Sequence, residues 1–404
     1  MHKFMEKLLE GAAVEWKKLG EVFNLKNGYT PSKSNKEYWT DGTVPWFRMD
    51  DIRLNGRVLN DSLQKVSMSA IKGGKLFPKN SIIISTSATI GEHALITVPH
   101  LSNQRFTNLS LKDEYLKKFN IKFLFYYAFI LDEWCKNNTT KSSFASVDMS
   151  GFKKIPIPIP PLEVQREIVR ILDNFTELTA ELTAELTAEL SARRKQYSYY
   201  RDRLLSFGED EVEWKKLGEV GEVRMCKRIL KNQTSEVGDI PFYKIGTFGK
   251  KANAYISREL FDEYKEKYSY PKKGEILISA SGTIGRAVIF DGKDAYFQDS
   301  NIVWIENDES IVLNKYLFYF YQIVNWNAAE GGTIKRLYND NLRKILIPIP
   351  ALGKQKEIVA ILDKFDTLTN SISEGLPKEI ELRQKQYEYY RDLLLDFPKE
   401  NVEV

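Results

Sequence analysis

Two long stretches of the chain place apolar residues three or four positions apart, from Gln165 to Asp202 and from Gln355 to Asp392. This spacing keeps the apolar side chains on one face of an α-helix. A helix of about 38 residues would be roughly 57 Å long at 1.5 Å per residue. Two such helices in one chain most simply pair with each other, and we expect an antiparallel pair. Gly375 and Pro377 predict a kink or short break in the second.

A mixed segment rich in aromatic, β-branched and glycine residues precedes each helical stretch. Short apolar runs within it, bounded by Gly, Asn, Ser or Thr, predict strands, and we therefore expect one α+β domain in each half. The predicted strands are Ser81–Ser85, Glu275–Ser279, Val44–Arg48 and Ile240–Lys244. Weaker helical signals lie around residues 117–136 and 314–327.

A run of alternating prolines ends each mixed segment, from Ile155 to Pro161 and from Ile345 to Pro350. Because proline has no amide proton, these runs are predicted to be neither helix interior nor central strand. We interpret them as extended connectors that deliver the chain to the long helix. Pro161 and the residues after it suit a helix start.

The two halves also share their sequence. Val14–Val22 is identical to Val212–Val220, and the repeat of roughly 190 residues far exceeds the roughly 20–50 residues of solenoid units. The chain therefore consists of two homologous halves with a built-in pseudo-twofold axis, which fits a pseudo-twofold partner such as duplex DNA. Three further matches keep the same order: Ser87–Gly91 with Ser281–Gly285, Ile157–Pro160 with Ile347–Pro350, and Lys195–Asp202 with Lys385–Asp392.

The first helical stretch contains a tandem tetrad, Thr-Ala-Glu-Leu, at Thr179–Leu182, Thr183–Leu186 and Thr187–Leu190. Each tetrad adds roughly 6 Å and advances the apolar stripe by about 40°. The tetrads are either low-complexity helix filler or a ruler. As a ruler, one tetrad would correspond to one to two base pairs at about 3.4 Å each.

Composition sets limits on the class of protein. The length of 404 residues predicts two to three domains, and the net charge of +4 permits DNA binding without arguing for it. No apolar run reaches the roughly 18–20 residues of a membrane span. The charged residues among the first fifteen do not fit a signal peptide. Two cysteines, at non-equivalent positions, give neither a disulfide framework nor a zinc site, so we expect a cytoplasmic protein without membrane contact.

Catalytic motifs are missing from the sequence. There are three histidines, none in the second half, and no HExxH, CxxC, Walker loop or adenine-methyltransferase motif. The repeated Glu-x-Lys at Glu15 and Glu213 lacks the acidic partner that a metal-dependent nuclease needs, and the adjacent Trp16 and Trp214 are predicted core anchors. We therefore predict no catalytic residue and no metal ligand in this chain.

Together, the paired motifs, the Ile-Pro-Ile-Pro runs and the tetrads resemble the specificity (S, HsdS) subunits of type I restriction-modification systems, and the tetrads are similar to those of the IC subgroup. This resemblance covers the whole chain. It implies a non-catalytic subunit whose two target-recognition domains each read half of a split, asymmetric duplex DNA site. Two modification (M) subunits would methylate adenine N6 with S-adenosylmethionine, and two restriction (R) subunits would add cleavage dependent on ATP and Mg²⁺. This chain would bind none of these cofactors.

The resemblance and the repeat together give the expected fold class: two homologous α+β target-recognition domains separated by a long antiparallel two-helix coiled coil. The recognition domains are predicted at residues 1–156 and 207–346. The spacer helices are predicted at residues 157–206 and 347–404. The halves differ between their shared motifs, for example Arg48–Asp51 against Lys244–Thr247, so we predict two unlike half-sites.

Candidate DNA contacts are polar or basic residues on predicted turns. In the first half they are Lys33, Ser34, Arg48, Ser87, Thr89, Gln104, Arg105, Lys141 and Ser142. In the second half they are Lys244, Lys250, Lys251, Ser281, Thr283, Arg286, Gln298, Lys335 and Arg336. By sequence offset Gln104 and Gln298 are equivalent, which favours a framework or phosphate role for both. In the repeated turns, Gly91 and Gly285 are either purely structural, supplying a positive φ, or part of the contact surface.

Candidates for the M-subunit interface lie near the helix ends, where helix–helix packing is an equally open interpretation: Tyr197, Tyr200, Arg201, Tyr387, Tyr390 and Arg391. A stand-alone, two-headed DNA-binding regulator is the alternative function. Tight, sequence-selective DNA binding by the isolated chain would favour that alternative.

Overall fold

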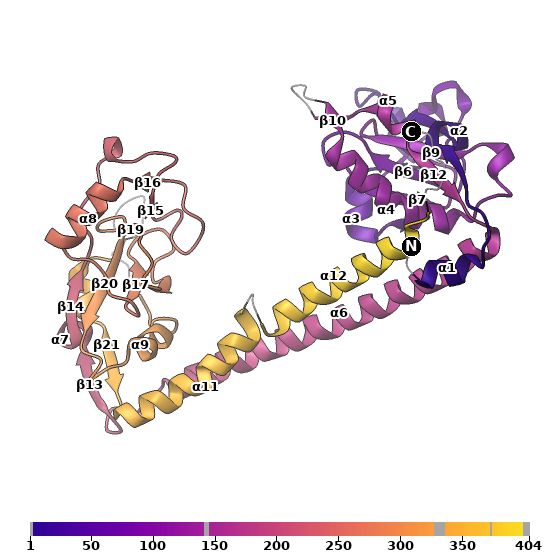
Figure 1. Cartoon of the computed structure of the whole chain (residues 1–404). Coiled ribbons are helices and arrows are strands. Elements are labelled where there is room, and N and C mark those ends of the chain that lie inside the picture. Colours follow the sequence, from indigo (N-terminus) through magenta and orange to yellow (C-terminus); the bar gives the residue numbers. More distant parts are fainter. Residues whose placement is uncertain (1–2, 141–144, 327–335, 372–373, 399–404) are drawn as a thin grey trace. The chain divides into compact units, whose positions relative to one another are not determined.

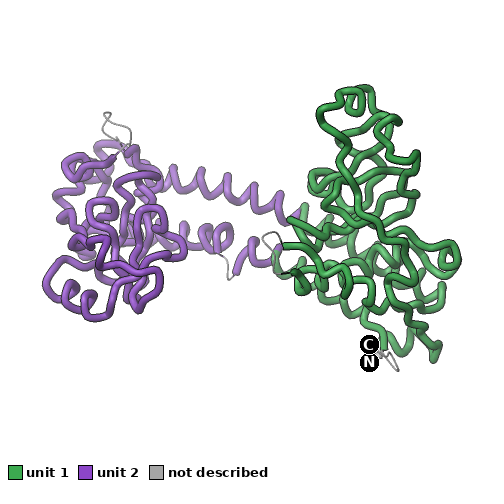
Figure 2. The backbone as a smooth tube through the Cα atoms, turned by 90° about the horizontal axis from the view of Figure 1, so that it is seen from above, with its two compact units in different colours: residues 1–184, 381–404 green, residues 185–380 purple. Residues whose placement is uncertain are grey.

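The structure is a computed structural model that describes residues 3–140, 145–326, 336–371 and 374–398. The chain forms two compact units (Figure 2): Met1–Ala184 with Glu381–Val404, and Glu185–Ile380. Each unit contains one mixed α+β domain and parts of both long helical stretches, so the first unit holds both ends of the chain.

The first unit contains a five-stranded sheet, whose three central strands are labelled in Figure 1, and a three-stranded sheet. The five-stranded sheet has the order β2 (Phe23–Asn27), β9 (Phe106–Leu111), β6 (Ser81–Ser85), β7 (His93–Ile96) and β4 (Val58–Leu59). The smaller sheet has the order β5 (Lys65–Val66), β3 (Val44–Phe47) and β8 (Leu101–Ser102). β10 (Thr139–Thr140) pairs with β11 (Ser146–Val147). The helices are α1 (Lys3–Leu9), α2 (Leu19–Val22), α3 (Met49–Asn55), α4 (Ile121–Asn137) and α5 (Met149–Phe152).

The second unit repeats this plan, with four strands in its larger sheet. Its larger sheet has the order β14 (Gly221–Arg224), β20 (Ile302–Asn307), β17 (Ile276–Ser279) and β18 (Ala287–Ile289). Its smaller sheet has the order β16 (Tyr255–Ile256), β15 (Ile240–Tyr243) and β19 (Tyr296–Phe297). The helices are α7 (Leu217–Val220), α8 (Arg258–Lys267), α9 (Asn314–Phe320) and α10 (Asn339–Arg343). The predicted α+β class is confirmed for both halves.

The proline runs are strands, which corrects the prediction that they are only connectors. β12 (Pro156–Ile159) pairs antiparallel with β1 (Glu15–Lys18), and β21 (Leu346–Ile349) pairs with β13 (Glu213–Lys216). Each pair is a two-stranded sheet, so alternate amide positions on the proline strand face an open edge. Proline at those positions costs no ladder hydrogen bond, whereas it would in a central strand.

The long helical stretches are confirmed. α6 (Leu162–Leu204) is one helix of 43 residues. The second stretch is divided into α11 (Leu352–Asn370) and α12 (Leu376–Leu395), as Gly375 and Pro377 predicted. Gly375 has φ +81°, and a Cβ at this position would lie 2.4 Å from the Thr367 carbonyl oxygen. Only glycine fits this reversal of backbone direction, which explains where the helix breaks.

The two stretches pack antiparallel within each unit. In the first unit, Phe175 of α6 lies 6.0 Å from Tyr390 of α12 between ring centroids, and Thr176 hydrogen-bonds Tyr387 at 3.0 Å. In the second unit, the Tyr197 and Phe365 rings lie 6.2 Å apart. The predicted antiparallel pairing is confirmed by these contacts.

Each mixed domain is fixed to its long helix by the same polar contact. Asp173 of α6 accepts hydrogen bonds from Lys122 at 2.7 Å and Tyr126 at 2.8 Å, both on α4. Asp363 of α11 accepts from the matching lysine and tyrosine of α9, each at 2.6 Å. Because the same contact occurs in both halves, each domain itself fixes the direction of its long helix, and the direction is not set by a loop.

The last described residues of the chain belong to the core of the first unit. Leu394, Leu395 and Phe397 are buried among residues of α4 and α6, and the Trp16 indole donates to the Pro398 carbonyl oxygen at 3.1 Å. Trp16 is half-buried against this core. The predicted role of Trp16 as a core anchor is therefore supported, and its partner segment comes from the opposite end of the chain.

Candidate nucleic-acid interface

The repeated turns have the same backbone in both halves. The second position of each turn has φ +66°, although it is Ala88 in the first half and Gly282 in the second. The last position is Gly91, at φ +78°, or Gly285, at φ +80°. The prediction that these glycines supply a positive φ is confirmed. A Cβ would also lie 2.5 Å from the Asp132 carbonyl oxygen at Gly91.

The alanine in the first turn predicts a stabilising substitution. A non-glycine residue in the left-handed conformation destabilises the folded chain by about 1–2 kcal/mol. Glycine avoids this cost, but its greater freedom in the unfolded chain offsets about 0.4–1 kcal/mol of the gain. We expect Ala88→Gly to stabilise the first unit by about 0.5–1 kcal/mol, measured by hydrogen exchange of the β6 and β9 amides. Gly282→Ala is the reciprocal control, because its Cβ would meet only Ile245 at an ordinary 3.6 Å. Equal stability for Ala88→Gly and wild type would contradict the expectation.

Each repeated turn lies beside a second turn that leads into the longest strand of its domain. In the first unit, the Thr86 amide donates to the Arg105 carbonyl oxygen at 2.9 Å. In the second unit, the Ala280 amide donates to the Asn301 carbonyl oxygen at 2.8 Å. We call the second turns the β8–β9 turn, residues 103–105, and the β19–β20 turn, residues 298–301.

The candidates of the first half meet around the β8–β9 turn. Gln104 and Arg105 are exposed on it, and Gln104 accepts a hydrogen bond from Thr30. The loop after β2 that contains Thr30 also carries exposed Lys33 and Ser34. Arg48 is half-buried and follows Phe47, whose carbonyl oxygen accepts from the Asn103 amide at 3.0 Å. Ser87 and Thr89 are half-buried on the neighbouring turn. Lys141 and Ser142 lie outside the described residues.

The candidates of the second half divide into framework and exposed groups. The Arg286 guanidinium donates to the Phe248 carbonyl oxygen at 2.9 Å, and Arg336 donates to the Ser300 carbonyl oxygen at 3.0 Å. Ser281 is buried and donates to Asn301 at 2.8 Å. These three side chains hold neighbouring loops together. The exposed candidates of this half are Lys244, Lys250, Lys251 and Thr283. Lys335 lies outside the described residues.

The assumed equivalence of Gln104 and Gln298 is wrong. The Gln298 amide donates to the Tyr243 carbonyl oxygen at 2.9 Å, which repeats the contact of Asn103 with Phe47 rather than any contact of Gln104. The second turn has one residue more than the first between matching anchors, so a constant sequence offset misaligns them. The Gln298 side chain also accepts from the Ile245 amide at 2.9 Å, which makes it a framework residue.

Three basic residues near the second turn were missed. Lys227, Arg228 and Lys231 are exposed on the loop that follows β14. This loop takes the place of the Lys33 loop in the first half, and Arg228 contacts Asp299 of the β19–β20 turn at 3.5 Å. The run Lys227-Arg228 was the available signal. The comparison of the two halves does not reveal it, because the sequences of the two loops do not align.

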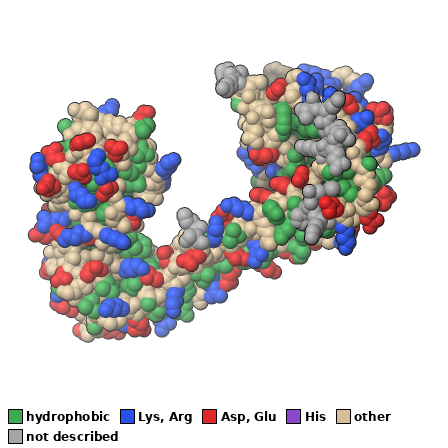
Figure 3. Space-filling model, in the orientation of Figure 1, with side chains coloured by type: hydrophobic (Ala, Val, Ile, Leu, Met, Phe, Trp, Pro, Cys, Tyr) green, Lys and Arg blue, Asp and Glu red, His purple; other side chains and the backbone are tan. Residues whose placement is uncertain are grey.

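Basic and acidic side chains are mixed on the face of the molecule seen in Figure 3. A mixed surface of this kind agrees with the net charge of only +4.

The M-interface candidates have unequal exposure. Tyr197 is only 7% exposed and donates to Gln322 at 3.0 Å. The side chain of Arg201 is 18% exposed, and the guanidinium of Arg391 lies 4.2 Å from the Phe129 ring centroid. Packing is the better interpretation for these three residues. Tyr387 is half-buried.

The exposed aromatic groups on these helices are adjacent to the buried ones. Tyr200 and Tyr390 are exposed, and so are Tyr199 and Tyr389, which were not among the candidates. The four tyrosines occupy matching positions in the two halves. A partner-binding surface on the helices would therefore keep Tyr200 and Tyr390 of the predicted set and add Tyr199 and Tyr389.

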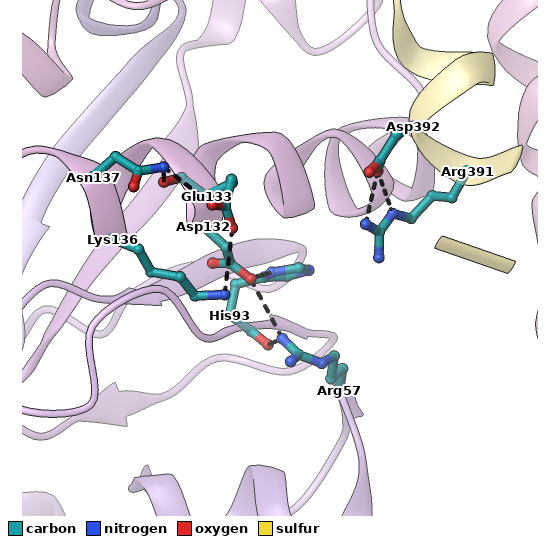
Figure 4. Close-up of polar contacts among 8 residues, drawn as sticks. All are labelled: Arg57, His93, Asp132, Glu133, Lys136, Asn137, Arg391 and Asp392. Atoms are coloured by element: carbon teal, nitrogen blue, oxygen red, sulfur yellow. Dashed lines mark hydrogen bonds and ion pairs between the residues drawn. The ribbon is translucent and has the colours of Figure 1, made fainter. Parts of the chain in front are cut away.

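Neither histidine of the mixed domains has the environment of a catalytic group. His93 is fully buried, with Nδ1 2.6 Å from Asp132 Oδ2 (Figure 4). His100 is also fully buried, and burial lowers its pKa to about 4. Within the described part of the chain, no group of three or more His, Cys, Asp or Glu side chains could hold a metal ion.

The low pKa of His100 predicts a pH-dependent stability. The pKa of His100 in the folded chain, about 4, is below the ordinary 6.5. Between these two pH values the unfolded chain therefore binds a proton at this residue that the folded chain does not bind. Stability is full above about pH 6.5 and falls by up to about 3 kcal/mol as the pH drops towards 4. Urea unfolding of the first unit at pH 7 and pH 5 should show this loss, and His100→Gln should reduce the difference. An unchanged difference in the variant would refute the assignment.

None of the described helices is both long and apolar enough to cross a membrane.

The fold consists of two α+β domains of one plan, each followed by a long helical stretch. Residues 13–192 and 209–382 match the family model described as "Type I restriction modification DNA specificity domain". The chain therefore belongs to the family of type I restriction-modification specificity subunits, and its function in that class is DNA recognition.

Relatives agree with this assignment. The chain is 50% identical to the EcoprrI specificity subunit of Escherichia coli over 383 residues, covering 92% of each chain. It is 34% identical to the EcoR124I/EcoR124II specificity subunit of Escherichia coli over 438 residues, covering 98% of this chain and 97% of the relative.

Two solved structures share the fold. One comes from a study of complex assembly and conformational transition of the type I R-M system, with a TM-score of 0.67, 17% identity, and coverage of 95% of this chain and 98% of that chain. The other is the HsdS subunit of Thermoanaerobacter tengcongensis, with a TM-score of 0.55, 17% identity and 96% coverage of both chains.

Proposed function

We propose that this chain binds a split, asymmetric duplex DNA site, with one half-site read by each mixed domain. The observation that carries the proposal is the contrast between a repeated frame and different turns. The strands, the positive-φ turns and the helix contacts recur in both halves. The β8–β9 and β19–β20 turns differ in length and charge. Two domains that share a frame but expose different groups suit two unlike half-sites.

The chain would act without catalysis of its own, by positioning partner subunits. Its relatives are named as specificity subunits of type I restriction enzymes. Two M subunits carrying S-adenosylmethionine would methylate adenine N6 at the bound site. Two R subunits would supply cleavage that depends on ATP and Mg²⁺. The exposed tyrosine pairs at 199–200 and 389–390 are suitable surfaces for two copies of one partner, because they recur in both halves.

The experiment that tests this function is a genome-wide map of N6-methyladenine. Cells without other adenine methyltransferases would express this chain with the M subunit of its own system. The expected result is one methylated motif with two different halves and a fixed gap. M subunit expressed alone is the control and should give no motif.

A stand-alone regulator would give a different result. The absence of any methylated motif, with M subunit shown to be bound and competent, would overturn the proposed function. Sequence-selective DNA binding by the isolated chain in that situation would support the regulator instead.

A further inference from the structure

The β8–β9 and β19–β20 turns occupy one place in a repeated frame. The amide of the first residue in each turn donates to the carbonyl oxygen of the last residue of a strand. Asn103 donates to Phe47 at the end of β3, and Gln298 donates to Tyr243 at the end of the matching β15. The carbonyl oxygen of the last residue in each turn accepts from the residue that follows β6 or β17. Arg105 accepts from the Thr86 amide, and Asn301 accepts from the Ala280 amide. The anchors are the same, so the segment between them can vary without moving the sheet. Variable loops on a rigid frame are where recognition residues are commonly placed.

The turn of the first unit exposes hydrogen-bond donors. Gln104 and Arg105 are both exposed, and no acidic residue occurs between β8 and β9. The Asn103 carboxamide accepts from the Arg105 amide at 3.0 Å, which fixes the backbone below the guanidinium. An arginine held in this way suits the two acceptors on the major-groove edge of guanine.

The turn of the second unit instead contains an acid in a strained segment. Ser300 has φ +57°, a conformation that costs a non-glycine residue about 1–2 kcal/mol. Its carbonyl oxygen accepts from Arg336 at 3.0 Å, and Asn301 accepts from Ser281. The strained backbone is thus fixed from two sides. The Asp299 side chain next to it is 19% exposed, beside Arg228, which is 73% exposed. Strain of this kind is concentrated at functional positions.

An acidic group at this position needs an explanation in terms of DNA chemistry. Exposed lysines flank the residues that contact this turn, since Lys227 precedes Arg228 and Lys244 follows Tyr243. A carboxylate close to basic residues weakens their attraction to phosphates. This loss of attraction is offset where a DNA base donates a hydrogen bond to the carboxylate. In the major groove the cytosine N4 amino group is such a donor, and Asp and Glu are suited to it.

We propose that these two turns determine the two half-sites, with Arg105 reading a guanine and Asp299 reading a cytosine. The inference rests on the proposed function. It goes beyond that function by naming the residue and the base class in each half. Arg228 then has a positioning role, because its guanidinium lies 3.5 Å from the Asp299 carboxylate.

The test uses the full chain with its M subunit and reads the methylated motif after single substitutions. Asp299→Asn should weaken the preference for cytosine at one position of one half-site by about tenfold, with the other half and the gap unchanged. Arg105→Gln should change one position of the opposite half-site in the same way. Asp308→Asn is the matched control, because this exposed acid lies just beyond the far end of β20.

Each other outcome has a defined meaning. An unchanged motif in both variants overturns the inference, while the wild-type motif still supports the proposed function. An equal loss of methylation at all sites, with the M complex assembled, also overturns it and assigns the turns to phosphate contact. If one variant does not assemble, the result with the other decides. A wild-type chain that gives no motif rejects the proposed function itself.

Discussion

Deletion of Thr183–Leu186 is expected to shorten the gap between the two methylated half-sites by one or two base pairs and to leave both half-sites unchanged. The tetrad lies within α6, which continues without a break from Leu162 to Leu204. Removing four residues from an unbroken helix shortens it by roughly 6 Å and rotates the remaining C-terminal part of the helix by about 40°. At about 3.4 Å per base pair, this corresponds to one or two pairs.

The mixed domains should not be affected by the deletion. Asp173 fixes α6 to the first domain, and Tyr197 fixes it to the second through Gln322. Both contacts lie outside the deleted tetrad. The readout is the same genome-wide map of N6-methyladenine, so gap and half-sites are measured together.

The control for this deletion is a variant that keeps the length. Thr179→Ala changes a tetrad without changing the helix, because alanine favours helix more than threonine does. Its gap should equal that of wild type. If the deletion also leaves the gap unchanged, the ruler is rejected and the tetrads are helix filler. A motif whose bases change as well would show that α6 does not act as a spacer alone.

The elements predicted correctly depend on local chemistry. α6 follows from apolar spacing, and the break before α12 follows from Gly375, because these signals lie within the element that they describe. The positive φ at Gly91 was predicted for the same reason. The internal repeat strengthens such predictions, because both copies of a sequence pattern must be compatible with the same local structure.

The features that were missed depend on contacts between distant segments. Nothing within the run around Pro158 indicates that β1 pairs with it from the start of the domain. The contact of Trp16 with Pro398 joins the two ends of the chain. The turn that contains Gln298 has one residue more than the turn of the first half. This extra residue does not alter the sequence pattern around Gln298, but it makes Gln298 equivalent to Asn103 and not to Gln104.

Asp132→Ala is expected to destabilise the first unit by about 3–5 kcal/mol. Figure 4 shows Asp132 of α4 directed at His93 of β7 and at Arg57, which precedes β4. Asp132 Oδ2 lies 2.6 Å from His93 Nδ1 and 3.5 Å from Arg57 Nη1. Arg57 also donates to the His93 carbonyl oxygen at 3.1 Å. Removing the carboxylate leaves a buried imidazole and a partly buried guanidinium without their common partner.

The measurement is the free energy of hydrogen exchange for the α4 and β7 amides, with β17 and β20 of the second unit as internal reference. Asp61→Ala is the matched control in the same unit. Its carboxylate pairs with Lys65 at 2.9 Å, and both side chains are well exposed. A surface pair contributes about 0–1 kcal/mol. A loss for Asp132→Ala no larger than that for Asp61→Ala would contradict the prediction.

A double-mutant cycle separates the hydrogen-bonded pair of His93 and Asp132 from simple loss of packing. The second unit has Ala287 where the first has His93, since Ile278 pairs with Ala287 as Ile84 pairs with His93. The fold therefore accepts alanine at this position of the hairpin. His93→Ala combined with Asp132→Ala should cost less than the sum of the single changes, by about 0.5–3 kcal/mol. Strict additivity would mean that each side chain acts through its packing alone, and that the buried pair is not a unit.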